Sequence, residues 1–390
     1  MPANKTKYGM LAETLKSEIL GGKYGKHNPF PSIRALIRRF GLSDSTVQRA
    51  LDELASLGMI ARKQGSGTFV TRQGASRTIG LIMPGVAYSA FFGPIVSELN
   101  RLACENRYKL QIGETYSSDA MRRLDEVRDL AASFVRQRVA GVIFQPSGGI
   151  SAAGELNYRI LNVFLRAKIP VVTLDDEITT PSGEIACDVI GIDDVNAGVR
   201  LAKHLIGMGV RQIHFLLHSF SETCDPADEN RLLGVMAAVV RSGLPFDMKK
   251  SVLRAAPDDV AALKRHIRRR CPDAFICSND AAAAIFRRTL AAAGLDVPQD
   301  VMLAGFGDLP ISALMSPPLT TMQQYPRSIA RGAFKRLLDR IEDPTLMPVK
   351  VSVVAPLVAR ASTDGRKWRL HRKNGSDLKK ARRHESHRKG

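Results

Sequence analysis

Apolar residues in the first seventy positions recur every three or four residues, which is the spacing of amphipathic helices. A first predicted helix stops at Gly21-Gly22, a second runs from Ser32 to Gly41, and a third runs from Ser43 to Gly58. Serine is a common helix N-cap and glycine commonly follows a helix, so these residues mark the helix ends. In the first helix Met10, Leu11, Leu15, Ile19 and Leu20 recur at helical spacing. The inward-facing residues expected in the next two helices are Ala35, Leu36, Phe40, Val47, Leu51, Leu54 and Leu57.

Two short strand candidates follow the third helix. They are Met59–Ala61 and Thr68–Thr71, and they flank the turn Gln64-Gly65-Ser66-Gly67. Three helices followed by a two-stranded hairpin predict an α+β winged helix-turn-helix domain.

The middle of the chain alternates short apolar runs with helical patterns. Strands are expected at Ile79–Met83, Lys109–Gly113, Gly141–Gln145, Pro170–Leu174, Val189–Ile192, Gln212–Leu217, Ser251–Leu253, Ala274–Cys277 and Met302–Phe306. Helices are expected at Phe92–Asn106, Met121–Arg138, Ala197–Met208, Arg231–Ser242, Asp258–Arg270 and Ala281–Ala293. This pattern predicts an α/β sensor of two subdomains with parallel sheets, whose strands bind ligand at their carboxyl ends across a cleft.

The chain is expected to divide into residues 1–71, a linker at 72–77, a sensor at 78–363, and a basic, disordered tail at 364–390. Residues 71–77, fully extended, reach at most about 25 Å, so the first domain stays close to the sensor. The tail either adds sequence-independent affinity for DNA phosphates or is a solvated segment without a role.

Composition adds one outlier to this picture, a net charge of +19 over 390 residues. Such a surplus favours a polyanionic partner, with nucleic acid preferred over a membrane. No stretch of eighteen apolar residues predicts a membrane span, and the N-terminus lacks the apolar segment of an export signal. The five cysteines form no Cys-x-x-Cys pair, so we expect reduced thiols and a cytoplasmic protein without a metal or cofactor.

The first domain resembles the GntR family of winged-helix regulators. The resemblance rests on Pro31–Leu36, Gly41–Leu51, Leu54, Leu57–Ile60 and Gly65–Val70, in the correct order and spacing. It implies that the third helix enters the major groove of a double-stranded DNA operator while the basic turn approaches the minor groove. Asp44 and Gln48 stand where the family commonly carries arginines, so the operator is expected to differ from better-known family sites.

Ser45, Gln48 and Arg49 lie on the polar face of the third helix, where glutamine suits adenine and arginine suits guanine or phosphate. Arg34 matches an arginine that grips DNA in the family. The alternative is a winged helix used for protein contacts. The expected DNA-binding residues are Arg34, Ser43, Ser45, Thr46, Gln48, Arg49, Arg62, Lys63, Gly65 and Gly67.

The middle zone is similar to the LacI-type sensor, which is itself similar to periplasmic sugar-binding proteins. The resemblance is carried by Ile79–Ile82, Ala140–Ile143, Ile169–Asp175, Ile192–Asp194, Ala197-Gly198, Asn230-Arg231, Gly234, Ala274–Asp280, Gly305–Asp308, Pro317–Thr321 and Arg360–Thr363. A GntR-type reader on a LacI-type sensor is the arrangement of arabinose repressor-like regulators. The resemblance implies a small-molecule effector, a sugar by default, that changes the affinity for DNA.

A polyol ligand needs convergent donors and acceptors beside a flat apolar wall. The expected ligand-binding residues are Tyr88, Phe91, Gln145, Asp175, Asp193, Arg231, Asn279 and Gln324. By resemblance, Arg231 is the ligand-gripping arginine, placed at the opening of its helix. Gly307 stands where many relatives carry a ligand-binding aspartate, which leaves Asp308. Phe92 is equally compatible with the core, and Asp194 and Asp280 are expected to be helix caps.

We expect a homodimer, because one short recognition helix reads few base pairs. No catalytic residue is expected, since no Gly-x-Ser-x-Gly elbow occurs and His214 and His218 lack the spacing of a zinc pair. A sugar-active enzyme, a solute-binding protein and a regulator that has lost its ligand are the alternatives.

Overall fold

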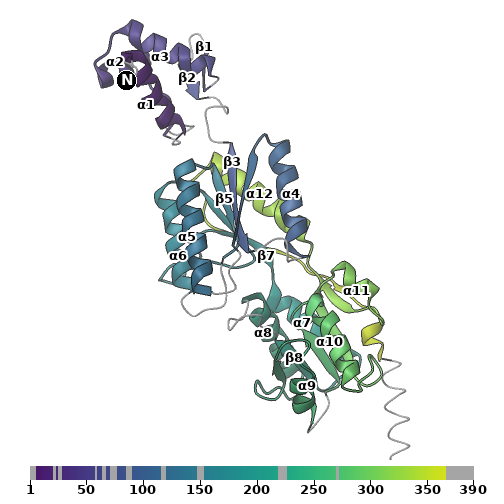
Figure 1. Ribbon diagram of the computed structural model, residues 1–390. Coiled ribbons are helices and arrows are strands. Elements are labelled where there is room, and N and C mark those ends of the chain that lie inside the picture. The colour runs from purple at the N-terminus through teal and green to yellow at the C-terminus, as the bar shows by residue number, and fades with distance from the viewer. Residues whose placement is uncertain are drawn as a thin grey trace, which may run out of the picture.

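The chain folds into an N-terminal domain followed by two sheet-based lobes (Figure 1). A computed structural model describes residues 6–20, 23–24, 29–57, 59–63, 67–70, 77–84, 90–115, 120–146, 153–217, 226–268 and 272–365. In the described residues no helix is both long and apolar enough to cross a bilayer.

The N-terminal domain is the predicted winged helix-turn-helix. Its elements are α1 (Lys7–Leu20), α2 (Ile33–Phe40), α3 (Asp44–Ser56), β1 (Ile60–Lys63) and β2 (Gly67–Val70), with β1 and β2 antiparallel. The predicted caps are present: Ser32 accepts a hydrogen bond from the Ala35 amide, and Gly41 ends α2 at φ 64°. Leu36 and Leu51 are fully buried, whereas Leu57 is 52% exposed, so its inward placement in the prediction was wrong.

The first lobe contains, in the described part of the chain, a parallel six-stranded sheet in the order β13-β7-β6-β5-β3-β4. Its strands are β3 (Thr78–Pro84), β4 (Lys109–Thr115), β5 (Gly141–Phe144), β6 (Val171–Leu174), β7 (Asp188–Ile192) and β13 (Lys350–Val353). Two helices pack on each face: α4 (Phe92–Glu105) with α12 (Pro326–Glu342), and α5 (Ala120–Gln137) with α6 (Ala153–Arg166).

The second lobe contains, among the described residues, a six-stranded sheet in the order β14-β12-β11-β10-β8-β9, in which only β14 is antiparallel to its neighbour. Its strands are β8 (Ile213–Leu217), β9 (Val252–Arg254), β10 (Ala274–Cys277), β11 (Met302–Gly307), β12 (Thr320–Gln323) and β14 (Leu357–Val358). Its helices are α7 (Asp194–Gly207), α8 (Pro226–Arg241), α9 (Val260–Ile267), α10 (Asp280–Ala292), the short α11 (Pro310–Leu314) and a 3-10 turn at Ala361–Thr363.

Helices α7 and α8 cover one face of the second sheet, and α9 and α10 cover the other. Glycines let α7 and α8 approach closely, because a Cβ at Gly234 would lie 2.0 Å from the carbonyl oxygen of Val195. A side chain there would force the two helices apart.

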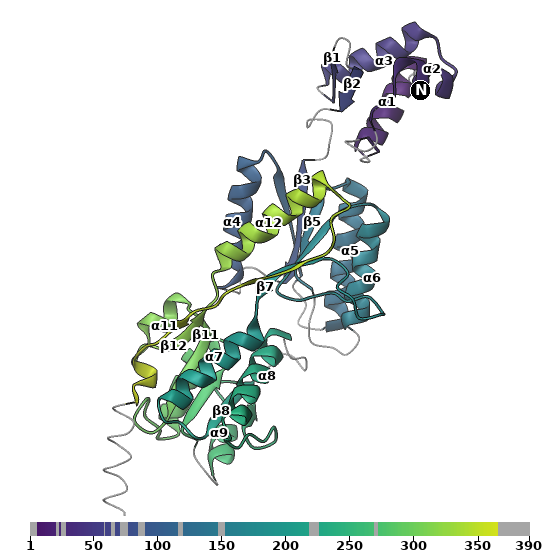
Figure 2. The ribbon, with the colours of Figure 1, turned by 180° about the vertical axis from the view of Figure 1, so that it is seen from behind.

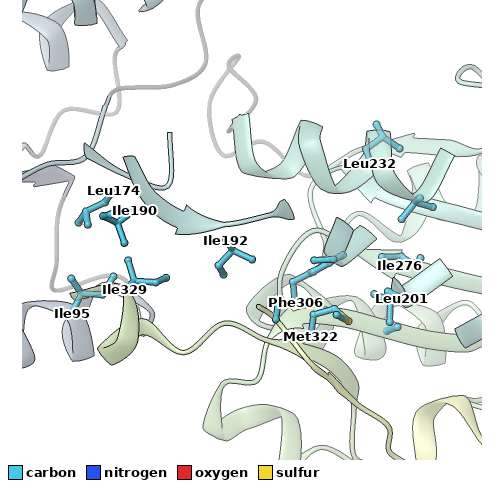
Figure 3. Close-up of a cluster of buried hydrophobic side chains, with 14 of the residues drawn as sticks. Ile95, Leu174, Ile190, Ile192, Leu201, Leu232, Ile276, Phe306, Met322 and Ile329 are labelled. Carbon is cyan, nitrogen blue, oxygen red and sulfur yellow. The ribbon is translucent and has the colours of Figure 1, made fainter. Parts of the chain in front are cut away.

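In the described part of the chain, three segments cross between the lobes. They lead from β7 into α7, from β12 into α12, and from β13 into β14. The apolar core continues along these crossings, and Figure 3 shows Ile192 between Ile190 of the first lobe and Phe306 and Met322 of the second. Because β7 and β12 each lead out of a parallel sheet into the other lobe, the carboxyl ends of the two sheets face each other.

The two-subdomain α/β prediction is confirmed, with strand ends shifted by one or two residues. Strands β12, β13 and β14 and helices α6 and α12 were not singled out from the sequence. Helix α8 begins at Pro226, so Arg231 lies in its second turn and does not open the helix as predicted.

Candidate nucleic-acid interface and interlobe site

The N-terminus of α3 gathers hydroxyl groups at its exposed end. The Ser43 hydroxyl caps the helix by accepting from the Thr46 amide at 3.4 Å. It also lies 3.2 Å from the Ser45 hydroxyl and 2.8 Å from that of Thr46. A helix N-terminus carries partial positive charge, so this end of α3 is suited to a DNA phosphate.

The next turn of α3 presents Arg49 and Gln48. Arg49 is exposed, and its guanidinium lies over the ring of Tyr8 at 5.5 Å from the centroid. The Gln48 side chain donates to Asp44 at 3.4 Å. Asp44 therefore orients the side chain of Gln48. These are the two residues that stand where arginines were expected from the resemblance.

The hairpin is tied to α3 by Arg62. Its guanidinium pairs with Asp52 at 3.0 Å and donates to the Gln48 carbonyl at 3.3 Å. This arginine positions the hairpin relative to α3 within the N-terminal domain. The backbone of Lys63 pairs with Gly67, whose φ of 105° requires glycine. Arg34 is exposed on α2, and Gly65 lies outside the described residues.

A polar cluster that the sequence did not reveal joins α1 to α2. Glu18 accepts from Arg39 at 2.9 Å and from Lys23 at 2.6 Å. The Arg39 hydrogen bond is the main reason why the pKa of Glu18 falls to about 2, despite partial burial. Burial raises the pKa of the neighbouring Tyr24 to about 12, together with its hydrogen bond to Glu18. The cluster therefore links the C-terminal part of α1 to the end of α2.

At the carboxyl end of the first sheet lie Gln145 and Asp175. Gln145 follows β5, is 9% exposed and donates to Asp176 at 3.3 Å. Its carbonyl oxygen Oε1 is buried with no hydrogen-bond partner among the described residues. Asp175 follows β6 at φ 57°, beside Gly191, where a Cβ would lie 2.5 Å from the Asp175 Cα. Such a backbone conformation is costly for a non-glycine residue and is found often at functional sites.

Arg231 reaches the second sheet from α8 and is 7% exposed. Its guanidinium pairs with Asp194 at 2.8 Å and Asp228 at 3.2 Å, donates to the Ser278 carbonyl at 2.8 Å, and lies 5.2 Å from the centroid of Phe306. The ion pairs fix Arg231 at the edge of the sheet. Asp194 is thus a partner of Arg231; the cap of α7 is Asp193, which is exposed and accepts from the Asn196 amide at 2.9 Å.

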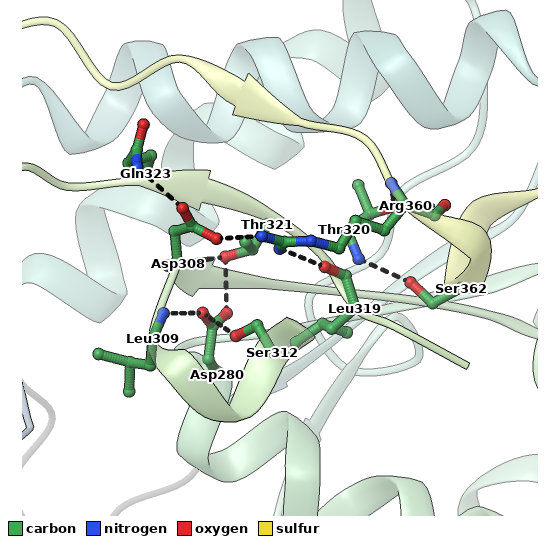
Figure 4. A network of polar contacts seen from close by, with 10 residues as sticks. All are labelled: Asp280, Asp308, Leu309, Ser312, Leu319, Thr320, Thr321, Gln323, Arg360 and Ser362. Atoms are coloured by element: carbon green, nitrogen blue, oxygen red, sulfur yellow. Dashed lines mark hydrogen bonds and ion pairs between the residues drawn. The ribbon is translucent and has the colours of Figure 1, made fainter. Parts of the chain in front are cut away.

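Asn279 caps α10 by accepting from the Ala282 amide at 2.9 Å, so the prediction that Asp280 is the cap was wrong. Asp280 is fully buried and accepts from the hydroxyls of Ser312 and Thr321, each at 2.6 Å, and from the Leu309 amide at 3.0 Å (Figure 4). Burial raises the pKa of Asp280 above its usual range, although these hydrogen bonds act in the opposite direction.

Gly307, the last residue of β11, has a backbone conformation that favours glycine. Gly307 has a φ of 134°, which L side chains rarely adopt. Asp308 follows at φ 52° and is held by Arg360 at 2.6 Å and by Gln323 at 2.9 Å (Figure 4). Asp308 therefore ties β11 to the β12 crossing, next to the buried Gln324.

We call Gln145, Asp175, Arg231, Asn279 and Gln324 the interlobe site, since they lie at the facing strand ends or in a crossing between the lobes. Phe91 directly precedes α4 and packs edge-on against Phe92, with ring centroids 5.5 Å apart. Tyr88 lies outside the described residues. Asp228 and Arg360 were not predicted as functional residues. Asp228 lies one helical turn before Arg231 on α8, and Arg360 pairs with Asp308 from a distant part of the sequence. The resemblance at Asn230-Arg231 and at Arg360–Thr363 was the nearest signal.

The described residues hold no group of three or more side chains suited to a metal ion. His214 lies 2.8 Å from His266, and burial, followed by the neighbouring imidazole, lowers its pKa to about 4. His218 lies outside the described residues.

Family comparisons fit both parts of the chain. Residues 7–70 match the family of bacterial regulatory proteins known as the gntR family, and residues 202–363 match a periplasmic binding protein-like domain. The chain is a ligand-responsive transcription regulator. It is 28% identical over 371 residues to an arabinose metabolism transcriptional repressor of Geobacillus stearothermophilus, covering 92% of this chain and 97% of the relative.

Solved structures share the fold of this regulator. The complex of the transcriptional regulator CelR with cellobiose has a TM-score of 0.62 at 19% identity, covering 92% of this chain and 99% of the other. A LacI family regulator from Enterococcus faecium with bound ribose has a TM-score of 0.59 at 20% identity, covering 73% and 98%.

Proposed function

We propose that this regulator is a repressor whose affinity for its operator changes when a sugar or related polar metabolite binds at the interlobe site. The observation that carries the proposal is the pairing of two features in one chain. Helix α3 exposes hydroxyls and Arg49 at its free face, and the sensor turns polar strand ends from two lobes toward each other.

The DNA contact follows from the N-terminal domain. The α3 end at Ser43 and Ser45 suits a phosphate, and Arg49 and Gln48 suit base edges in the major groove. Arg62 holds the hairpin against α3, so both are presented to DNA as one rigid unit. Arg34, Thr46, Lys63 and the turn at Gly65 and Gly67 complete the proposed surface.

The effector contact draws on both lobes. The buried Oε1 of Gln145 and the carboxylate of Asp175 suit hydroxyl donors, while Arg231 and Asn279 offer hydrogen bonds from the second lobe. Gln324 lies in a crossing, so a ligand touching it contacts a segment that joins the lobes. Binding that favours one lobe arrangement shifts the population toward it. Tyr88, Phe91 and Asp193 complete the proposed set.

The protein is further proposed to act as a homodimer in the cytoplasm, where its DNA partner lies. Two half-sites restore the affinity and specificity that one short helix lacks. The division at residues 1–71, 72–77, 78–363 and 364–390 remains a prediction. The relatives are named as transcription regulators and not as enzymes, and we propose no catalytic step.

The test begins with footprinting on genomic fragments, followed by affinity for the protected duplex with arabinose, ribose and cellobiose each added. We expect a preference over random duplex of at least about a thousandfold, altered by one of the sugars. Arg49→Ala should weaken binding to the protected duplex by roughly ten- to hundredfold, the range for one base contact. Arg128→Ala, an exposed arginine on α5, is the control. No preference for any fragment, with or without sugars, would exclude the proposed function.

A further inference from the structure

The edge of the first sheet where its strands begin carries three basic turn residues. Helices α4, α5 and α6 end in Arg107, Arg138 and Lys168, with φ of 60°, 54° and 58°. All three side chains are exposed. Strand β3 starts at this same edge, at Thr78, where the chain arrives from the N-terminal domain.

Each of these turns is a Schellman motif. At the end of α5, the Arg138 amide donates to the Val135 carbonyl at 3.0 Å and the Val139 amide to the Phe134 carbonyl at 3.2 Å. The backbone of Arg138 is therefore fixed by its own helix, and its side chain projects from a rigid turn.

Arg138 makes hydrogen bonds to the N-terminal domain. Its guanidinium donates to the Ser17 hydroxyl at 3.1 Å and also to the Ser17 carbonyl. Ser17 lies in the last turn of α1. In Figures 1 and 2 the end of α1 lies above the end of the lobe that carries α5 and α6.

The chemistry of this contact is complementary. The last four carbonyls of a helix lack partners within the helix, and the C-terminal end carries partial negative charge. A guanidinium can satisfy such a carbonyl and interact favourably with that charge. The nearby Glu18 does not compete for Arg138, since it is engaged by Arg39, Lys23 and Tyr24.

We propose that Arg138 is the docking residue through which the sensor holds the N-terminal domain, by binding the C-terminal end of α1. The contact limits the orientations open to the domain beyond what the short connecting segment imposes. This deepens the proposed function, because it names the surface through which the sensor sets the position of the DNA-binding domain.

The test compares Arg138→Asn with Lys168→Asn in the full chain, without DNA or sugar. Asparagine tolerates the left-handed conformation, so both variants should keep the turn. Lys168 is the matched control, because it is basic, exposed and in the same kind of turn at the same edge. Trypsin cleavage after Arg72 or Arg77, in the connecting segment, is followed with time.

We expect cleavage of Arg138→Asn to be about three- to tenfold faster than that of the wild type, the range for loss of an exposed guanidinium's hydrogen bonds. Lys168→Asn should match the wild type, and both variants should melt at the same temperature. Equal rates in all three proteins, or equal acceleration in both variants, would overturn the docking contact. Since no DNA is used, this result is independent of whether the repressor proposal holds.

Binding to a random-sequence duplex at several salt concentrations separates docking from direct DNA contact. A docking residue leaves the salt dependence unchanged in both variants. A salt slope that falls by about one in each variant would mean that these residues bind phosphates themselves, and would overturn the proposal.

Discussion

Helices in both lobes of the sensor end in the same kind of turn, but the two lobes place different residues in it. In the second lobe, α7, α8 and α10 end in Schellman turns at Gly209, Gly243 and Gly294, with the same backbone hydrogen bonds as the turns of the first lobe. The first lobe places arginine or lysine at the equivalent positions. Because a side chain at positive φ costs roughly 1 kcal/mol, the geometry of the turn does not account for the basic residues. The contacts of their side chains must explain these residues, as the contact with Ser17 does for Arg138.

The two lobes also differ in how each holds one fully buried aspartate. Asp188 in the first lobe is fully buried and pairs with Arg336 at 3.0 Å and with Arg340, and it accepts from the Val349 amide at 2.8 Å. Asp280 in the second lobe is equally buried but is held by hydroxyls and an amide. Charged partners therefore hold Asp188, and neutral donors hold Asp280, although the second lobe also has a buried ion pair between Arg231 and Asp194.

The largest expected effect comes from removing Asp188. Asp188→Ala leaves the partly buried Arg336 and Arg340 beside each other without their carboxylate, and we expect a loss of about 3 kcal/mol in the free energy of unfolding. Chemical denaturation measures it. The control is Asp339→Ala on α12, the helix that carries Arg336 and Arg340. This change removes the exposed ion pair with Lys335 and should lower the free energy of unfolding by less than about 1 kcal/mol. Equal losses of unfolding free energy in the two variants would contradict the stabilising role given to Asp188.

A pH effect distinguishes the second lobe. Because the pKa of Asp280 is raised in the folded state, the folded protein binds this proton more tightly than the unfolded chain. The stabilisation is present below the usual range of an aspartate and is lost as the pH rises through the folded pKa.

The measurement for Asp280 is the free energy of unfolding against pH for the wild type and Asp280→Asn. The difference between them should change by at most about 1.4 kcal/mol per pH unit, with the wild type losing ground as the pH rises. Parallel curves from pH 4 upward would show that Asp280 does not titrate differently in the folded state.

The smallest effect tests the turns directly. Gly243→Ala should lower the free energy of unfolding by about 1 kcal/mol, since the open space around Gly243 leaves backbone strain as the main cost. Lys168→Gly should raise the free energy of unfolding by roughly 0.5 kcal/mol through relief of that strain, less the cost of glycine flexibility. If both variants changed the free energy of unfolding in the same direction, the turns of the two lobes would not differ in backbone strain as described.

Local signals predicted much of the fold. Ser32, Gly41 and Ser43 fixed the helix ends of the N-terminal domain, and continuous apolar runs identified the strands from β3 to β11. Strand β12 was not predicted because the polar Thr320 and Thr321 are buried in it. Helix α12 was overlooked although its buried residues Ile329, Ala333 and Leu337 follow helical spacing. The ends of α4 to α6 carried no glycine to mark them.

The interlobe site was predictable only by position. That Gln145 and Asp175 end strands follows from the pattern, but the φ of Asp175 and the pairing of Arg231 with Asp194 depend on contacts between distant elements. The cap of α10 is Asn279 and not Asp280 as predicted, because a cap and the residue after it look alike in a sequence. Long-range hydrogen bonds decide such cases.

The three crossings have a consequence for synthesis on the ribosome. The first lobe takes most of its strands from residues 78–192, yet α12 and β13, which complete it, come from residues 326–353. A nascent chain that has passed Ile192 must leave one face of the first sheet without α12 while most of the second lobe is translated. Neither lobe can be released as a finished unit by cutting the chain once, so chaperones would meet the first lobe with this apolar face covered by α4 alone.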